Sequence, residues 1–420
     1  MTTRDVPPSR LRRLMETGGL IAIAVVVMNL GTYGFQIVAA RMVGPAQYGS
    51  IASLLAIQFV MSVLQLGLQT TAARRIAAEP DRVADIEHGI MVLAWRASAL
   101  VAAALLLASP LIEHMLNLNS ILPALLLAIG AFPMNLMGAQ AGILQGERRW
   151  APLAAVYLAA GVPRVILGVI ALSIRPTEGS AMAAVAAGWF APCIVGWVCL
   201  SFGSRARERR SGRPIGLRPI TTEVAHGSLA LLGFFALTNI DIVMSRHIFT
   251  EHGSGLYAGG LILTKAVLFL PQFVSVLAFP AMSTTAARRT VLIRSLTMVA
   301  AVGVACVLGA LVLTDLAMIF VGGSEYDAIR GYLWRFAVLG TLLAGLQLLV
   351  YSVLARQSRR SSWLLWAAVA VVAVVGWWHI STMTQLLNLM LCTDAVLFAL
   401  LLGFSLWTMR ADEPSRVSAQ

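Results

Sequence analysis

Charged residues are scarce in this chain, and residues that carry catalytic chemistry are scarcer still. Only 12% of the 420 residues are charged, and there are just six histidines and four cysteines. The histidines do not cluster, and the sequence patterns of zinc hydrolases, serine hydrolases and phosphate-binding loops are missing. The cysteines lie inside apolar runs at spacings that suit no metal site. The sequence therefore argues against an enzyme, a bound metal and a cofactor.

Apolar sequence, in contrast, is abundant. Hydrophobic residues make up 59% of the chain and recur in runs long enough to cross a bilayer. This composition excludes a soluble protein and predicts an all-α, polytopic membrane protein. The expected spans, about twelve, are 17–40, 48–71, 88–109, 119–143, 151–174, 180–203, 224–246, 254–282, 291–320, 329–352, 362–380 and 386–409. The net charge of +12 does not indicate nucleic-acid binding, because the basic residues form short clusters between the spans.

The distribution of arginines predicts the orientation in the membrane. Both ends of the chain and every second connection hold 23 arginines together, whereas the remaining connections hold four. Because basic residues are enriched in cytoplasmic loops, both termini are expected in the cytoplasm. This orientation requires an even number of spans, which agrees with twelve.

The spans divide into two related halves. We expect an N-terminal six-helix bundle at 1–203, a basic cytoplasmic linker at 204–223 and a C-terminal six-helix bundle at 224–420. The six residues TTAARR occur at 70–75 and again at 284–289, at equivalent positions of the two halves. Each half has six spans and starts on the same side, so the halves are predicted to be parallel repeats with a substrate site between them.

Polar residues form stripes on the first two expected helices. Asn29, Tyr33 and Gln36 are four and three residues apart, and Gln58 and Gln65 share one face of the second helix. A polar stripe is out of place against lipid, so the stripes should face each other or a water-filled cavity. Alternatively, these side chains only hydrogen-bond one helix to its neighbour.

Ionisable residues deep in the spans need a physical reason, because they are costly inside a bilayer. They are Arg96, Arg164, Asp241, Lys265, Arg335 and Asp394. For Arg96 and Arg164 the alternatives are anion binding by the forked guanidinium and an extension of the side chain towards the membrane interface. Asp241 and Lys265 are interpreted either as a neutralising pair, or as an ion-coupling carboxylate beside a lysine of the anion site.

Several motifs in a fixed order suggest a family. They are Arg41-x3-Pro45-x2-Tyr48-Gly49, then GILQGERR at 142–149, NIDI at 239–242 and GLYA at 255–258, followed by Lys265 and Pro280. Over about residues 30–290 this order resembles the polysaccharide-transporter branch of the multidrug/oligosaccharidyl-lipid/polysaccharide exporter superfamily. The resemblance implies an inverted-V cavity between two bundles. It also implies flipping of a lipid-linked oligosaccharide across the bacterial cytoplasmic membrane by alternating access.

The resemblance further implies roles for particular residues and partners. The cations that would hold the pyrophosphate are Arg41, Arg96, Arg164 and Lys265. The polar residues that would contact the sugars are Asn29, Tyr33, Gln36, Gln58 and Gln65. The ion-coupling residue would be Asp241. The implied partners are the lipid-linked glycan, membrane lipids, and a glycan polymerase or glycosyltransferases. Two rival functions remain. One is a multidrug cation antiporter of the same superfamily, which needs a buried carboxylate, and the other is a non-transporting scaffold of a glycan-assembly complex.

Overall fold

The computed structural model describes residues 10–204, 217–269, 288–354 and 359–411. Within these ranges the chain is helical and contains no strand, as the apolar runs predict. The α-helices are α1 (Arg10–Ala78), α2 (Val83–Met115), α3 (Leu122–Gly146), α4 (Trp150–Ile174), α5 (Glu178–Ser204), α6 (Leu217–Ile248), α7 (Glu251–Phe269), α9 (Arg288–Val312), α10 (Thr314–Val321), α11 (Leu333–Leu354), α12 (Arg359–His379) and α13 (Met383–Ala411). Two 3-10 segments are η1 (Pro80–Arg82) and η3 (Ser324–Tyr332).

Helix α1 contains two spans. Its 69 residues would extend about 100 Å if straight, several times the hydrocarbon thickness of a bilayer. The chain bends at Gly44, whose φ of 73° and ψ of 172° are not helical. A positive φ favours glycine, and Pro45 then supplies the fixed φ with which the second part begins. The division into two spans, 17–40 and 48–71, that the sequence predicts is therefore confirmed.

The remaining spans follow the prediction closely. Nine helical stretches of the described chain are long and apolar enough to cross a membrane. With α1 counted twice, and with the shorter α7 and α12 added, they reproduce the twelve expected spans. The ninth span is shorter than the predicted 291–320, because α9 ends at Val312. A separate short helix, α10, follows it and carries an exposed Asp315. The basic linker, residues 270–282 of the eighth span, Pro280 and the repeat at 284–289 lie wholly or largely outside the described residues.

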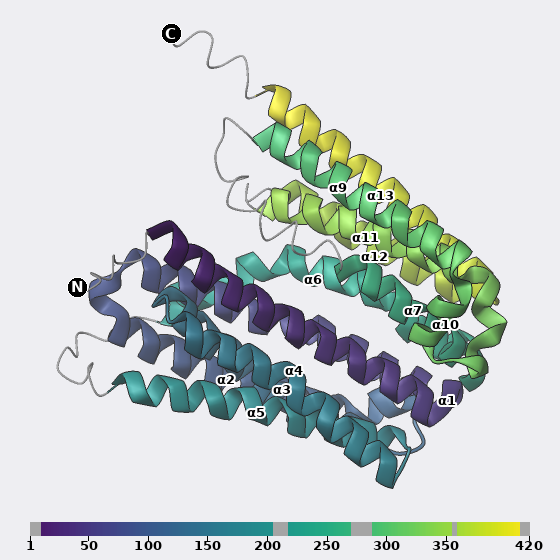
Figure 1. Ribbon diagram of the computed structural model, residues 1–420, viewed down its shortest axis with the longest axis horizontal. Helices are drawn as coiled ribbons and strands as arrows, with labels where there is room; N and C mark the ends of the chain where they lie inside the picture. The colour runs from purple at the N-terminus through teal and green to yellow at the C-terminus, as the bar shows by residue number, and fades with distance from the viewer. Residues whose placement is uncertain (1–9, 205–216, 270–287, 355–358, 412–420) are drawn as a thin grey trace, which may run out of the picture.

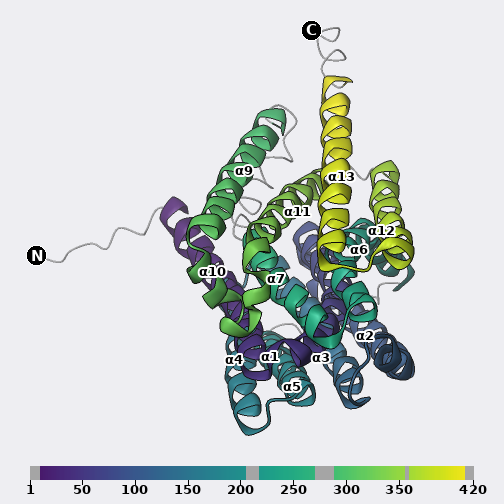
Figure 2. The same cartoon turned by 90° about the vertical axis from the view of Figure 1, so that its right-hand side faces the viewer.

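The helices form two groups that share one contact surface. Helices α1–α5 make up the first group and α6–α13 the second; α1 packs on α3 and α4 of its own group and on α6 and α7 of the other. The start of α1 and the end of α13 lie at the same end of the molecule, which we call the proximal end (Figure 1). The groups diverge towards this end and meet at the opposite, distal end (Figure 1). Seen from the distal end, α9 and α13 of the second group lie above α4 and α5 of the first (Figure 2).

A buried arginine joins the two groups at the distal end. Arg246, near the end of α6, is only 2% exposed. Its Nε donates to the carbonyl of Leu116 at 2.8 Å, and its Nη2 donates to the carbonyl of Asn117 at 2.7 Å. Both carbonyls follow α2, where helix ends leave acceptors unsatisfied and attract positive charge. Arg246 therefore connects the second group to the first.

The turn at Gly44 makes a second connection at the distal end. Arg41 donates to the carbonyl of Ile319 in α10, and the Tyr326 hydroxyl donates to the carbonyl of Ala40 at 3.2 Å. Gly255, at the start of α7, lies so close that a Cβ added there would overlap the carbonyl of Pro45. The two groups are thus in backbone contact at this end.

Candidate functional site

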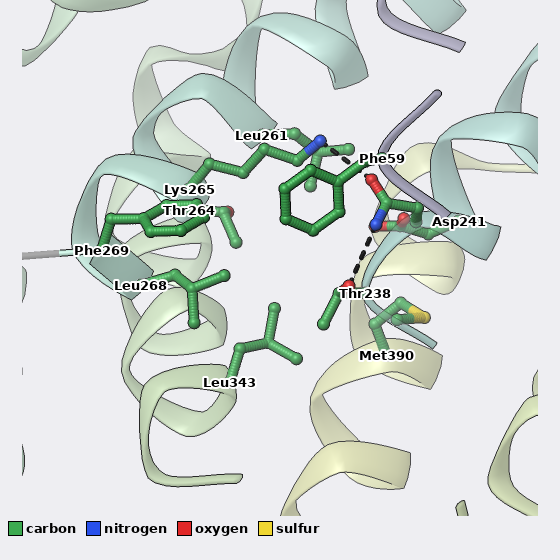
Figure 3. Close-up of a pocket in the computed structure, with 11 residues that line it drawn as sticks. Phe59, Thr238, Asp241, Leu261, Thr264, Lys265, Leu268, Phe269, Leu343 and Met390 are labelled. Atoms are coloured by element: carbon green, nitrogen blue, oxygen red, sulfur yellow. Dashed lines mark hydrogen bonds between the residues drawn. The ribbon is translucent and has the colours of Figure 1, made fainter. Parts of the chain in front are cut away.

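A small cavity with a mainly apolar lining and a few polar side chains lies where α1 meets the second group (Figure 3). It is lined by Phe59 of α1 and by Thr238, Asn239, Asp241, Leu261, Thr264, Lys265, Leu268, Phe269, Leu343 and Met390 of the second group. Its volume of about 10 Å³ has room for about one water molecule. The cavity therefore presents polar groups to a space that is nearly closed in this conformation.

Lys265 is the cation of this cavity. Its Nζ donates to Oδ1 of Asn239 at 3.0 Å and lies 5.8 Å from the ring centroid of Phe59 (Figure 3). Among the described residues, Lys265 forms no ion pair within 4 Å, but it interacts electrostatically with Asp241, so a neutralising pair stays a prediction. The ammonium is therefore held by a neutral amide and an aromatic face.

Asn239 is fixed by its own helix. Its Nδ2 donates to the carbonyl of Phe235 at 2.8 Å and to Oγ1 of Thr238 at 3.0 Å. The Thr238 hydroxyl donates in turn to the same carbonyl at 3.1 Å. Because both amide hydrogens are taken, the amide oxygen is the atom directed at Lys265.

Asp241 has neutral partners instead of a cation. Its Oδ2 accepts a hydrogen bond from the Tyr257 hydroxyl at 2.8 Å, and its Oδ1 accepts one from the backbone amide of Ile242 at 2.8 Å. The Asp241 side chain is 1% exposed and Tyr257 is fully buried. The carboxyl group is therefore held in place by two neutral hydrogen-bond donors.

Aromatic rings from both groups close the cavity on the side of α1. Phe59 lies 4.7 Å from Phe235 and 6.3 Å from Phe269, measured between ring centroids. Tyr33 lies 5.4 Å from Phe269. Tyr33 is thus placed at the surface between the groups, next to the cavity that contains Lys265.

Arg164 lies in the first group, apart from this cavity. It is 5% exposed, and its guanidinium carbon lies 4.3 Å from the ring centroid of Trp189. Its Nε and Nη2 have no hydrogen-bond partner among the described residues. Gly188 makes room for the pair, because a Cβ there would lie 3.3 Å from the Cα of Arg164.

The glutamine stripe of the second span faces α3. Gln65 donates to the sulfur of Met137 at 3.2 Å, and Gln69 donates to Oε1 of Gln145 at 3.0 Å. Gln58 is buried, and its Nε2 lacks a partner among the described residues. For Gln65 the observed contact is the helix-to-helix alternative that the sequence left open.

The remaining predicted site residues are dispersed. Asn29 and Gln36 are half-buried on the first part of α1. Arg96 is exposed on α2, and Arg41 is exposed at the distal end. The structure therefore brings together Lys265, Asp241 and the neighbourhood of Tyr33, but neither Arg41 nor Arg96 reaches that cavity.

Two functional candidates were missed by sequence reasoning. Asp394 of α13 is fully buried and had been noted only as a deep charge. Arg246 ends an apolar run, so the sequence alone groups it with the arginines of the connections. The signal for Arg246 was weak, since only its neighbours in space show that it is buried.

The fold is that of membrane transporters of known structure. An inward-facing multidrug resistance transporter of the MATE family, within the MOP superfamily, is similar with a TM-score of 0.71 and 14% identity, over 92% of this chain and 95% of that one. An outward-facing MATE transporter gives 0.69 at 14% identity, over 95% and 96%. A MOP superfamily transporter from Pyrococcus furiosus gives 0.67 at 14% identity, over 94% and 96%. At such low identity the likeness shows the fold alone.

The family is shown by the sequence itself. The family model described as polysaccharide biosynthesis protein matches residues 15–286, more than half of the chain. The chain belongs to this family, as its motifs led us to expect, and it has the fold of multi-pass membrane transporters. No curated protein matches it in sequence.

Proposed function

We propose that this protein moves a lipid-linked oligosaccharide or polysaccharide precursor across the bacterial cytoplasmic membrane by alternating access, with both termini in the cytoplasm. The family supports a glycan-related cargo, and the fold supports transport in place of catalysis. The partners are then the lipid-linked glycan, the surrounding lipids and a polymerase or glycosyltransferase that uses the cargo.

The observation that carries this proposal is two buried or half-buried cations, one in each group, that form no ion pair within 4 Å among the described residues. Lys265 in the second group and Arg164 in the first make no ion pair among the described residues, although Arg164 is almost fully buried. Burying a charge is costly unless a partner compensates it. A phosphate or pyrophosphate group would supply that partner, and a guanidinium suits its geometry. Arg41 and Arg96 lie elsewhere, so the proposed anion site rests on Lys265 and Arg164.

The polar side chains on the two spans of α1 are the proposed contacts for sugar hydroxyls. They are Asn29, Tyr33 and Gln36 of α1, with Gln58 and Gln65 behind them on the second span. Amide and hydroxyl groups both donate and accept hydrogen bonds, which matches the hydroxyls of a glycan. Movement apart of α1 and α7 would open the space closed by Tyr33 and Phe269.

The test is lipid analysis of cells that lack the gene. We expect a polyprenyl-linked sugar to accumulate and to disappear when the wild-type gene is returned. Lys265→Met and Arg164→Met should each reduce export by about 10- to 100-fold, because a hydrogen bond to a charged group contributes about 1.5–3 kcal/mol. Arg294→Ala is the matched control, since this arginine is exposed on α9. Full export by both methionine variants would refute the anion site.

A multidrug cation antiporter is the second candidate. The observation that favours it is the buried carboxyl of Asp241, since exchange of a cationic drug needs such a group. In that case the deletion would leave lipid-linked sugars unchanged and would make cells sensitive to cationic dyes. Asp241→Asn would then reproduce the sensitivity of the deletion.

A further inference from the structure

Several buried hydrogen-bond donors gather around Arg164 inside the first group of helices. The Nε and Nη2 of Arg164 are buried and unpaired among the described residues, and so is the indole Nε1 of Trp189. The guanidinium carbon of Arg164 lies 4.3 Å from the centroid of the Trp189 ring, so these donors share one place. Because a buried donor without an acceptor costs free energy, this place suits a ligand that accepts hydrogen bonds.

Gln58 of α1 supplies a further unpaired donor at the same level of the bundle. Gly138 of α3 meets Gln65, and successive contacts rise together along the two helices, which are therefore parallel. Seven residues earlier in both helices, Gln58 comes level with the residue next to Gly130. A Cβ at Gly130 would lie 3.7 Å from Cδ1 of Trp189. The Nε2 of Gln58 is buried and has no partner among the described residues, so α1, α4 and α5 all bring free donors to this level.

The surrounding helices offer Arg164 no counter-charge. Helices α3 and α4 contain no acidic residue, and the only one in α5 is Glu178, ten residues or about 15 Å before Gly188. The unpaired buried acceptor on α3, Oδ1 of Asn135, is neutral. Since a guanidinium keeps its charge in proteins, the missing partner of Arg164 is an anion.

Close packing of the helices limits the size of that anion. A Cβ at Gly188 would lie 3.3 Å from the Cα of Arg164, and a Cβ at Gly130 would lie 3.1 Å from the Cα of Ala186. Arg164 is 5% exposed and Gln58 is 4% exposed. A lipid-linked pyrophosphate cannot pass between helices packed this closely, whereas an anion of one or a few atoms can.

We propose that Arg164 and Trp189, with Gln58 at the same level, bind a small inorganic anion such as chloride inside the first group. A monatomic anion accepts several N–H hydrogen bonds at once and compensates the charge of Arg164, whereas a water molecule brings no charge. The bound anion also stabilises the packing of α4 on α5. Its later exchange for the pyrophosphate of the cargo is a step that rests on the proposed function.

The test is thermal unfolding of the purified full-length protein in sodium chloride and in sodium gluconate of equal concentration, with no glycan added. We expect chloride to raise the Tm by about 2–5 °C relative to gluconate, because it binds the folded state. Arg164→Gln should lose this rise. Trp189→Phe, which keeps the ring and removes only the N–H, should reduce it and serves as the test if Arg164→Gln folds poorly.

Matched controls separate the site from a general effect of the salt. Arg96→Gln removes an exposed arginine of the same group, and Trp197→Phe changes a tryptophan of α5 that is 66% exposed. Both controls should keep the full rise in Tm.

The outcomes separate this inference from the proposed function. An equal effect of chloride on the wild-type protein and on both site variants would overturn the small-anion site. A rise in Tm that depends on Arg164 and occurs in sodium pyrophosphate but not in chloride would also overturn it, and would leave the proposed pyrophosphate site standing. A chloride effect that depends on Arg164, together with full glycan export by Arg164→Met, would support the small-anion site and refute only the role of Arg164 in binding the cargo.

Discussion

Removal of Arg246 should open the distal end. The Arg246 guanidinium makes two hydrogen bonds to carbonyls of the first group, at 2.8 Å and 2.7 Å, and both must break when the two groups separate there. A hydrogen bond to a charged group contributes about 1.5–3 kcal/mol. Taking the lower value for each, Arg246→Ala should disfavour the distally closed state by about 3 kcal/mol, roughly 100-fold in the population ratio. Arg246→Lys, which keeps the charge but not the fork, should produce a smaller shift.

Distance measurement between spin labels would detect this shift. Asn119, after α2, and His252, in α7, are exposed on opposite groups at the distal end. In a background without the four native cysteines, labels at Asn119→Cys and His252→Cys should report mainly short distances in the otherwise wild-type protein. In Arg246→Ala the longer distances should become dominant.

A matched arginine distinguishes this effect from a general loss of charge. Arg330 also lies at the distal end, but it pairs with Asp315 and Asp327 of its own group and is exposed. Exposed ion pairs contribute about 0–1 kcal/mol, so Arg330→Ala should leave the distance distribution unchanged. The reasoning is wrong if Arg246→Ala also leaves it unchanged, or if both variants change it equally.

Two further predictions concern glycines at close helix contacts. Gly255→Ala should prevent distal closure and abolish transport, because the new methyl group would overlap the carbonyl of Pro45; the same spin labels and a transport assay would show this. Gly142→Ala should lower the Tm of the detergent-solubilised protein, since its Cβ would lie 2.7 Å from the Cα of Gln69 and overpacking costs about 1–3 kcal/mol. Gly331→Ala, with no atom within 4 Å of the added Cβ, is the control that should change neither property.

The helices could be predicted from the sequence because each span is a long apolar run with its own internal hydrogen bonds. The bend at Gly44 was also predictable, since glycine followed by proline interrupts the apolar pattern locally. The end of the ninth span was harder to predict from the sequence. The apolar run continues past Val312, but α9 ends there and Leu313, with φ of −105° and ψ of 45°, is not helical.

The site was harder to predict, because the spacing of polar residues shows which of them share a face of a helix but not which helix that face packs against. The spacing placed Gln58 and Gln65 on one side of their helix, yet that side packs on α3, where Gln65 meets Met137. Likewise, Asp241 and Lys265 lie near each other on neighbouring helices, but the carboxylate of Asp241 accepts its hydrogen bond from the Tyr257 hydroxyl. Which partner a long side chain selects depends on its height along the helix and its rotamer, and neither can be read from spacing.

Helix α6 connects the contact of Arg246 at the distal end to the cavity that contains Lys265. Arg246 and Asn239 lie on it seven residues apart, two turns or about 10 Å along the axis. Between them, the Ser53 hydroxyl of α1 lies 3.2 Å from the carbonyl of Ile242, next to Asp241. If α6 moves as a rigid helix when the distal end opens, Asn239 must move relative to α1 and its Phe59. Opening would then change the surroundings of Lys265, which under the proposed function couples release of the anion to opening of the distal end.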